Sequence, residues 1–86
     1  MIQKVDVPVT ALGVFDHQKR SLVFEKVLWE GRSYEIKKLG YHHNFRRGRT
    51  LYHVFSLVSE NLFFRLVLDT ESLTMRVMEI ADENAD

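Results

Sequence analysis

The sequence predicts an all-β domain, a small antiparallel meander of five or six strands curled into an SH3-like or OB-like open barrel. Apolar residues recur at every second position in several segments, which is the spacing of strands that bury one face. Short polar stretches separate these segments, as expected for hairpin turns. Helical spacing of apolar residues is hard to find. Because the strands are few, we expect the sheet to curl in order to bury its apolar faces.

The size and composition favour one small globular domain. The chain has 86 residues, of which 45% are apolar and 28% charged, so we expect one core over residues 1–80 and a disordered acidic tail over residues 81–86. The absence of cysteine excludes disulfides, thiolate metal sites and a thiol nucleophile. Without a signal-like segment near the start, we expect a cytoplasmic protein. The longest apolar windows are too short and too polar for a membrane-spanning helix.

The first predicted strand contains Val5, Val7 and Val9 in strict alternation with polar residues or proline. Pro8 places this strand at a sheet edge, because proline donates no hydrogen bond to a neighbouring strand. Residues 10–19 are predicted to be a connection with a turn at residues 16–17 and at most a short strand at residues 14–15.

The next two apolar segments, residues 22–29 and 32–39, predict a β-hairpin. The turn between them contains Gly31, which supplies the positive φ angle that such tight turns need. Gly40 is expected to end the second arm. Residues 41–49, with the sequence YHHNFRRGR, are therefore predicted to form a loop that projects from the sheet.

Three further strands are predicted at residues 50–58, 62–68 and 73–80, joined by short polar turns. Leu62, Phe64, Leu66 and Leu68 alternate with polar or smaller residues and should share the core face. Phe63 must then leave the opposite face, either beneath a covering segment or in an interface. Because some of these strands are apolar on both faces, the loop, the N-terminal segment or a second subunit should cover the outside.

Charge is unevenly distributed along this formally neutral chain. Residues 1–31 are balanced, residues 32–49 carry a net charge of +5, and residues 50–86 carry −5. Such a separation is evidence about binding surfaces.

The basic segment predicts a non-catalytic binding module, with single-stranded nucleic acid as its first candidate ligand. Arginine grips phosphate oxygens and stacks on bases, and aromatic rings on small β-barrels receive unstacked bases. The predicted nucleic-acid-binding residues are Lys37, Lys38, Tyr41, Phe45, Arg46, Arg47 and Arg49.

Two alternatives remain open. The segment could be a solvated connection whose arginines pair with the acidic second half while Tyr41 and Phe45 cover the sheet. The domain could also be a protein–protein interaction or self-association module, with a homodimer formed between oppositely charged surfaces.

The sequence predicts no catalytic residue, no metal site and no cofactor. Adjacent side chains of an extended segment point to opposite sides, so His42 and His43 should not share one ion. The sequence has no recognisable Ser/His/Asp constellation, no glycine-rich phosphate loop before a helix and no paired carboxylates in an identifiable pocket.

The stretch FEKVLWEGRSYEIKKL at residues 24–39 resembles the opening F-x-W-x-G-x-x-Y-x-V of a small bacterial β domain of unknown function. That family occurs as stand-alone proteins and at the C-terminus of some Y-family (DinB-type) DNA polymerases. The layout of residues 50–80 is similar to its second half, although Leu73 and Met75 stand where the family has a W-x-L pattern. The matching positions are Trp29, Gly31, Tyr34, Ile36, Tyr52, Val54, Phe63, Leu66, Asp69 and Ile80. The resemblance implies a small β-barrel linked to nucleic-acid processing and carries over no catalytic residue.

Overall fold

A computed structural model describes residues 2–82, and within them every regular element is a β-strand. The prediction of an all-β antiparallel domain is thereby confirmed. The described chain forms eight strands: β1 (Ile2–Pro8), β2 (Thr10–Asp16), β3 (Ser21–Trp29), β4 (Arg32–Glu35), β5 (Lys38–Arg47), β6 (Thr50–Val58), β7 (Leu62–Asp69) and β8 (Thr74–Asp82).

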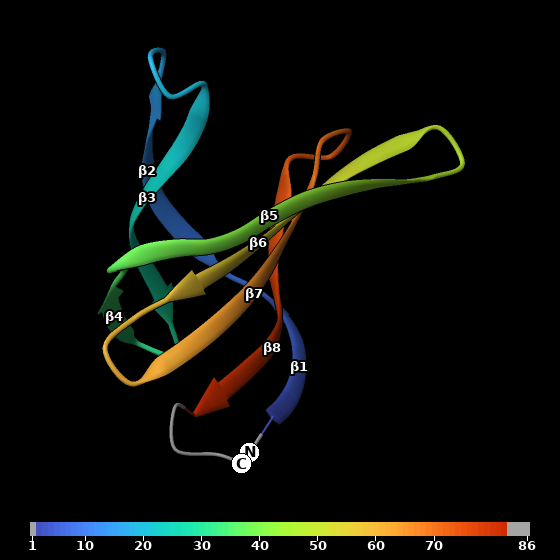
Figure 1. Ribbon diagram of the computed structural model, residues 1–86. Coiled ribbons are helices and arrows are strands. Elements are labelled where there is room, and N and C mark those ends of the chain that lie inside the picture. The colour runs from blue at the N-terminus through green and yellow to red at the C-terminus, as the bar shows by residue number, and fades with distance from the viewer. Residues whose placement is uncertain (1, 83–86) are drawn as a thin grey trace.

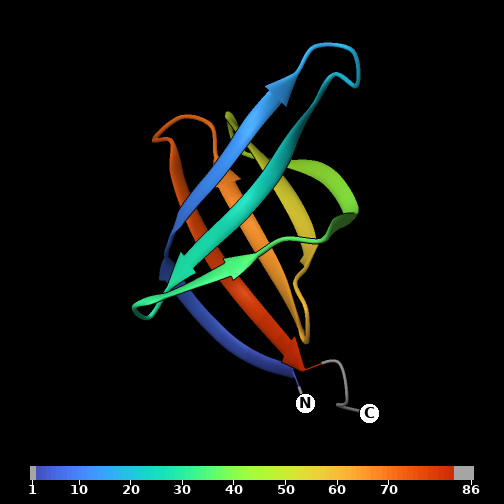
Figure 2. The same ribbon diagram turned by 90° about the vertical axis from the view of Figure 1, so that its left-hand side faces the viewer.

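The strands form two sheets that wrap around one core (Figures 1 and 2). The larger sheet has the order β1-β8-β7-β6-β5 and the smaller one the order β2-β3-β4, with antiparallel pairing throughout. β1 lies at an edge, as Pro8 predicts, and its first residue, Ile2, pairs with Ala81 of β8. The arrangement is that of a small barrel-like domain.

The chain changes from one sheet to the other at two corners. At the first, the Val9 amide donates a hydrogen bond to the Met75 carbonyl of β8, at 3.0 Å. At the second, the Ile36 amide donates a hydrogen bond to the Glu25 carbonyl of β3, at 2.9 Å. The next amide, that of Lys37, donates to the Val58 carbonyl of β6, at 2.7 Å. Strands that switch sheets through bends make the corners of orthogonally packed sheets.

The core lies between the two sheets and draws on both. Its largest fully buried side chain is Phe64, 1% exposed, which packs against the rings of Trp29 and Tyr34 with centroid separations of 6.4 and 5.2 Å. Phe24 of the small sheet meets Phe55 of the large sheet edge-on, at 4.9 Å. The buried cluster consists of Phe24, Val27, Phe55, Leu57, Phe64, Leu66, Val77 and Ile80.

The predicted hairpin and the predicted faces of β7 are confirmed. Trp29 pairs with Arg32, and the two turn residues between them, Glu30 and Gly31, have φ angles of 49° and 75°. Positive φ at both central positions is the signature of a type I′ turn, whose twist matches that of its strands. In β7, Phe64 is buried while Phe63 is 40% exposed on the opposite face.

The prediction that residues 41–49 form a loop is wrong. Residues 38–47 are strand β5, which pairs with β6 from Lys38↔Val58 to Arg47↔Thr50 and leaves residues 48–49 as the turn. Gly40 does not end an arm but sits in a bulge within this strand. Because most of this strand is exposed on both faces, its polar residues hide the alternation that reveals a half-buried strand.

Two other boundaries also differ from the prediction. Residues 10–16 form the full strand β2, not a connection, and residues 32–39 are divided between β4 and β5 by the second corner. The tail expected at residues 81–86 overlaps β8, which includes Ala81 and Asp82, and its remaining residues, 83–86, lie outside the described residues. No helix in residues 2–82 is long and apolar enough to cross a membrane.

Candidate functional site

The strand β5 carries two different faces along an exposed sheet edge. His42 pairs with the buried Phe55, so it lies on the inner face, which looks toward the small sheet. Alternation then places Tyr41, His43, Phe45 and Arg47 on the outer face, which points away from the small sheet. The β5–β6 hairpin extends beyond the rest of the large sheet at its far end (Figure 1).

The outer face of β5 presents a row of aromatic rings. Tyr41 is 62% exposed, and its ring lies 5.2 Å from that of His43. Phe45 is 38% exposed and stacks nearly parallel on Tyr52 of β6, with centroids 5.0 Å apart and an interplanar angle of 13°. Residues two apart on a strand are separated by about 7 Å. The row therefore offers successive ring surfaces to a planar ligand.

The three arginines of the segment lie at the turn end of this hairpin and are all exposed. The ion pairs recorded among residues 2–82 join Lys37 with Glu35, Arg65 with Glu79 and Arg76 with Asp6, so none of them involves Arg46, Arg47 or Arg49. The alternative in which these arginines pair with the acidic second half is therefore not what the structure contains. Their guanidinium groups remain available to an anion from outside.

Lys37 and Lys38 lie at the opposite end of β5, about 30 Å from the turn by the rise of a strand. Together with Lys19 they line a hollow of about 350 Å³, to which residues of β3 and β5 contribute. Lys37 also approaches Glu35 at 3.9 Å, a contact between two exposed side chains that contributes little. The seven predicted residues thus form two basic groups with the aromatic row between them.

An acidic residue shares the outer face near the arginines. Asp69 pairs in register with Tyr52, and a second hollow, of about 430 Å³, is lined by Arg47, Tyr52, Asp69 and neighbouring side chains. The Asp69 carboxylate accepts backbone hydrogen bonds from Ser72 and Glu71, at 3.1 and 2.9 Å, and these bonds lower the pKa of Asp69. Its charge is therefore engaged in the β7–β8 turn, which Thr70 fastens to the Leu51 carbonyl of β6.

The histidines divide between the two faces, as the sequence predicts for an extended segment. On the inner face, His42 Nε2 lies 2.9 Å from His53 Nδ1, and the His42 ring stacks on Phe55 at 4.6 Å. Burial and the neighbouring His53 and His43 lower the pKa of His42, so its neutral form is favoured. No group of three metal-ligating side chains gathers within residues 2–82.

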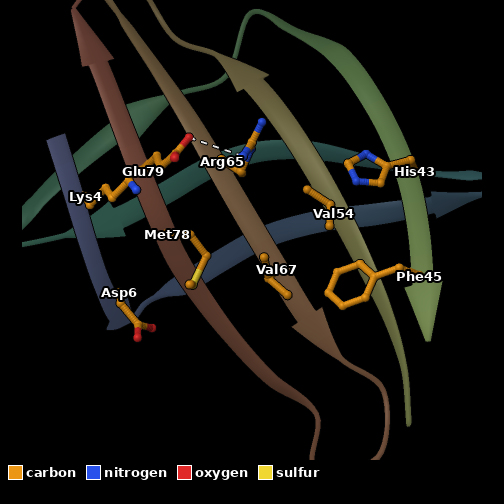
Figure 3. A pocket seen from close by; sticks show the side chains of 9 residues that line it. All are labelled: Lys4, Asp6, His43, Phe45, Val54, Arg65, Val67, Met78 and Glu79. Carbon is orange, nitrogen blue, oxygen red and sulfur yellow. Dashed lines mark ion pairs between the residues drawn. The ribbon is translucent and has the colours of Figure 1, made fainter. Parts of the chain in front are cut away.

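A shallow hollow of about 440 Å³ crosses the outer face of the large sheet (Figure 3). Val54, Val67 and Met78 form its middle, His43 and Phe45 stand on the β5 side, and charged residues of β1, β7 and β8 stand on the other. Sequence reasoning missed this hollow because its residues come from five strands that only the pairing register brings together. Tyr52, which supports Phe45, was missed for the same reason.

Comparisons of the chain with protein-family models, curated proteins and solved structures find no match.

Proposed function

We propose that this domain is a non-catalytic module that binds single-stranded nucleic acid along the outer face of β5. The observation that carries the proposal is the exposed aromatic row ending at three arginines without ion-pair partners among residues 2–82. Stacking tolerates any base, because every base has a π face, and each stacked base contributes about 1–3 kcal/mol.

The proposed path follows β5 from the lysines to the arginines. Lys37 and Lys38 would neutralise phosphates at one end and Arg46, Arg47 and Arg49 at the other, with bases stacked on Tyr41 and Phe45 between them. Bases in a duplex expose only their edges, so a surface that works through ring faces favours single strands. The proposal places the module in the cytoplasm, as the cysteine-free sequence suggests.

Removing the three arginines tests the proposal directly. We expect the triple variant Arg46→Ala, Arg47→Ala, Arg49→Ala to bind a labelled oligonucleotide much more weakly and with a smaller salt dependence. Losing three phosphate contacts should reduce the slope of log K against log salt by about 2 for a single strand. Fluorescence anisotropy at several salt concentrations measures both quantities.

A matched control removes the same charge elsewhere. Arg20, Lys26 and Arg32 are exposed residues in and beside the small sheet, and their triple change to alanine alters the net charge equally. We expect this control to keep nearly all affinity. Equal losses in the two triple variants would mean that the protein attracts nucleic acid only through its overall charge, and the proposed site would be wrong.

Self-association is a second candidate, favoured by the open edge of β5. Within residues 2–82, β5 pairs with β6 alone, so the ten residues of this strand have one side free for another strand. The exposed Phe63 adds apolar surface on the outer face. Light scattering over a concentration series without nucleic acid tests this candidate, and a constant monomer mass would rule out the homodimer.

A further inference from the structure

The hollow on the outer face adjoins the aromatic row but differs from it in chemistry. Val54, Val67 and Met78 give it an apolar floor, and Val54 is only 4% exposed even though it points away from the core. β1, with Lys4 and Asp6, lies on one side of this floor, and β5, with His43 and Phe45, lies on the other, as Figure 3 shows. At about 440 Å³ the hollow lies within the size range of small-molecule sites.

One side of the hollow is aromatic. Phe45 stands there with Tyr52 stacked behind it, so the Phe45 ring is held in place before any ligand arrives. His43 stands beside it, and its Nδ1 atom is buried without a hydrogen-bond partner within residues 2–82. A buried polar atom without a partner costs free energy that a ligand group within reach would recover.

The other side of the hollow is polar. Lys4 of β1 lies opposite Glu79 of β8 in the strand register. Arg65 of β7 forms an ion pair with Glu79, with Nη1 3.3 Å from Oε1. Arginine has five N–H donors, so this single contact leaves others free. The ammonium, guanidinium and carboxylate groups thus place donors and an acceptor in one row along the edge of the hollow (Figure 3).

The balance of charge indicates what kind of group fits. Two basic residues, Lys4 and Arg65, face two acidic residues, Asp6 and Glu79, around the hollow, so it has no net charge to hold a phosphate. An uncharged planar heterocycle with apolar faces and a hydrogen-bonding edge matches an aromatic wall, an apolar floor and a mixed polar rim. A phosphate is better bound by the arginines at the hairpin turn, which have no ion-pair partner among residues 2–82.

We infer that this hollow receives one unstacked nucleobase of the bound strand, an inference that rests on the proposed nucleic-acid binding. The base lies against Phe45 and the Val67 side of the floor, and its edge meets the Arg65–Glu79 pair. At this one position, the affinity therefore depends on contacts with the edge of the base. Along the rest of the path, the protein contacts only phosphates and the ring faces of bases.

A double-substitution experiment tests this inference. In the protein, Val67→Phe fills the floor of the hollow, and in a short oligonucleotide one base at a time is replaced by an abasic site. We expect one abasic position to weaken binding to the native protein about five- to a hundredfold, the value of one stacked base. The same abasic position should hardly change the affinity of the Val67→Phe variant, because that variant has already lost the contact with the base.

The controls separate this inference from the proposed function. Val14→Phe makes the same size change on the small sheet, where Val14 is exposed, and should leave the abasic effect intact. If Val67→Phe fails to fold by circular dichroism, Met78→Phe fills the hollow from β8 instead. If the abasic cost is equal in native and hollow-filled proteins, the base lies elsewhere and the inference fails while salt-dependent binding stands. If no oligonucleotide binds even at low salt, the proposed function fails together with the inference.

Discussion

At the scale of single residues, the pair His42 and His53 shows how β5 creates contacts that spacing along the chain does not suggest. The two residues are eleven apart and their nitrogens meet at 2.9 Å because β5 and β6 are paired in register. His42 and His43 point to opposite sides of β5, as the sequence predicts. The contact between His42 and His53 was not predicted, because residues 41–49 were expected to form a loop.

The lowered pKa of His42 predicts a pH dependence of stability. As the pH falls through the ordinary value of 6.5, the unfolded chain takes up a proton that folded His42 resists until lower pH. The unfolded state then binds more protons, so the free energy of unfolding should decrease from pH 7.5 to pH 5.5. Urea denaturation across this range measures it, and His42→Gln should flatten the decrease.

His17 provides the control for this prediction. It lies in the β2–β3 turn and is not part of the His42–His53 pair, so the decrease should be flattened more by His42→Gln than by His17→Gln. Asp69 does not interfere, because its pKa lies below 3.8 and its contribution is lost only in more acidic solution. An unaltered profile in His42→Gln would show that the histidine pair does not contribute to the pH dependence.

At the scale of the elements, two glycines fix hairpin geometry for different reasons. A Cβ at Gly13 would lie 2.9 Å from the Val23 carbonyl oxygen, at the bulge where β2 shifts register against β3. At Gly31 no atom lies within 4 Å of such a Cβ, but its φ of 75° disfavours ordinary side chains. The first glycine is required by space and the second by backbone conformation.

Asparagine substitutions should distinguish these two requirements. Asparagine tolerates the left-handed conformation, so Gly31→Asn should cost only a few tenths of a kcal/mol, less than Gly31→Ala. At position 13 both alanine and asparagine should destabilise the protein by about 1–3 kcal/mol, because either Cβ forces the β2–β3 backbones apart. Chemical denaturation of the four variants measures the differences. Recovery of stability by Gly13→Asn would contradict the steric explanation.

The elements also show what pattern reasoning can and cannot find. β3, β6, β7 and β8 were predicted within a few residues, because each buries an apolar face that alternation reveals. β5 was missed, and β2 was predicted only as a possible short strand at residues 14–15, because both run through hairpins that extend past the core, where few side chains are buried. Such strands are held by backbone hydrogen bonds to a neighbour and leave only a weak periodic signal in the side chains.

At the scale of the whole molecule, stability depends on side chains that join the two sheets. Phe64 of the large sheet contacts Trp29 and Tyr34 of the small sheet, so Phe64→Ala should cost about 3–5 kcal/mol, much of the stability of a domain of this size. Phe63→Ala, on the exposed outer face, should cost less than about 1 kcal/mol. Comparable losses in these adjacent variants, measured by thermal or urea unfolding, would contradict the assignment of faces.

The candidate site is predictable from sequence only in part. The sequence singles out the basic and aromatic residues of 37–49, but it leaves the exposure of Tyr41 and Phe45 open. Their exposure, and the division of the basic residues between the two ends of a strand, depend on β5 being extended. The hollow that adjoins Phe45 requires the order β1-β8-β7-β6-β5, in which the first strand of the chain joins the last. No local sequence pattern predicts the pairing of β1 with β8, because this pairing depends on which sheet faces pack against each other.

The pairing of β1 with β8 has a consequence for how this domain could be joined to other proteins. Ile2 and Ala81 are antiparallel partners, so the chain enters and leaves the fold at neighbouring points. A domain of this kind tolerates insertion into a surface turn of a host protein, because the host chain is interrupted without being spread apart. Fusion partners attached at either end would likewise lie near that shared corner.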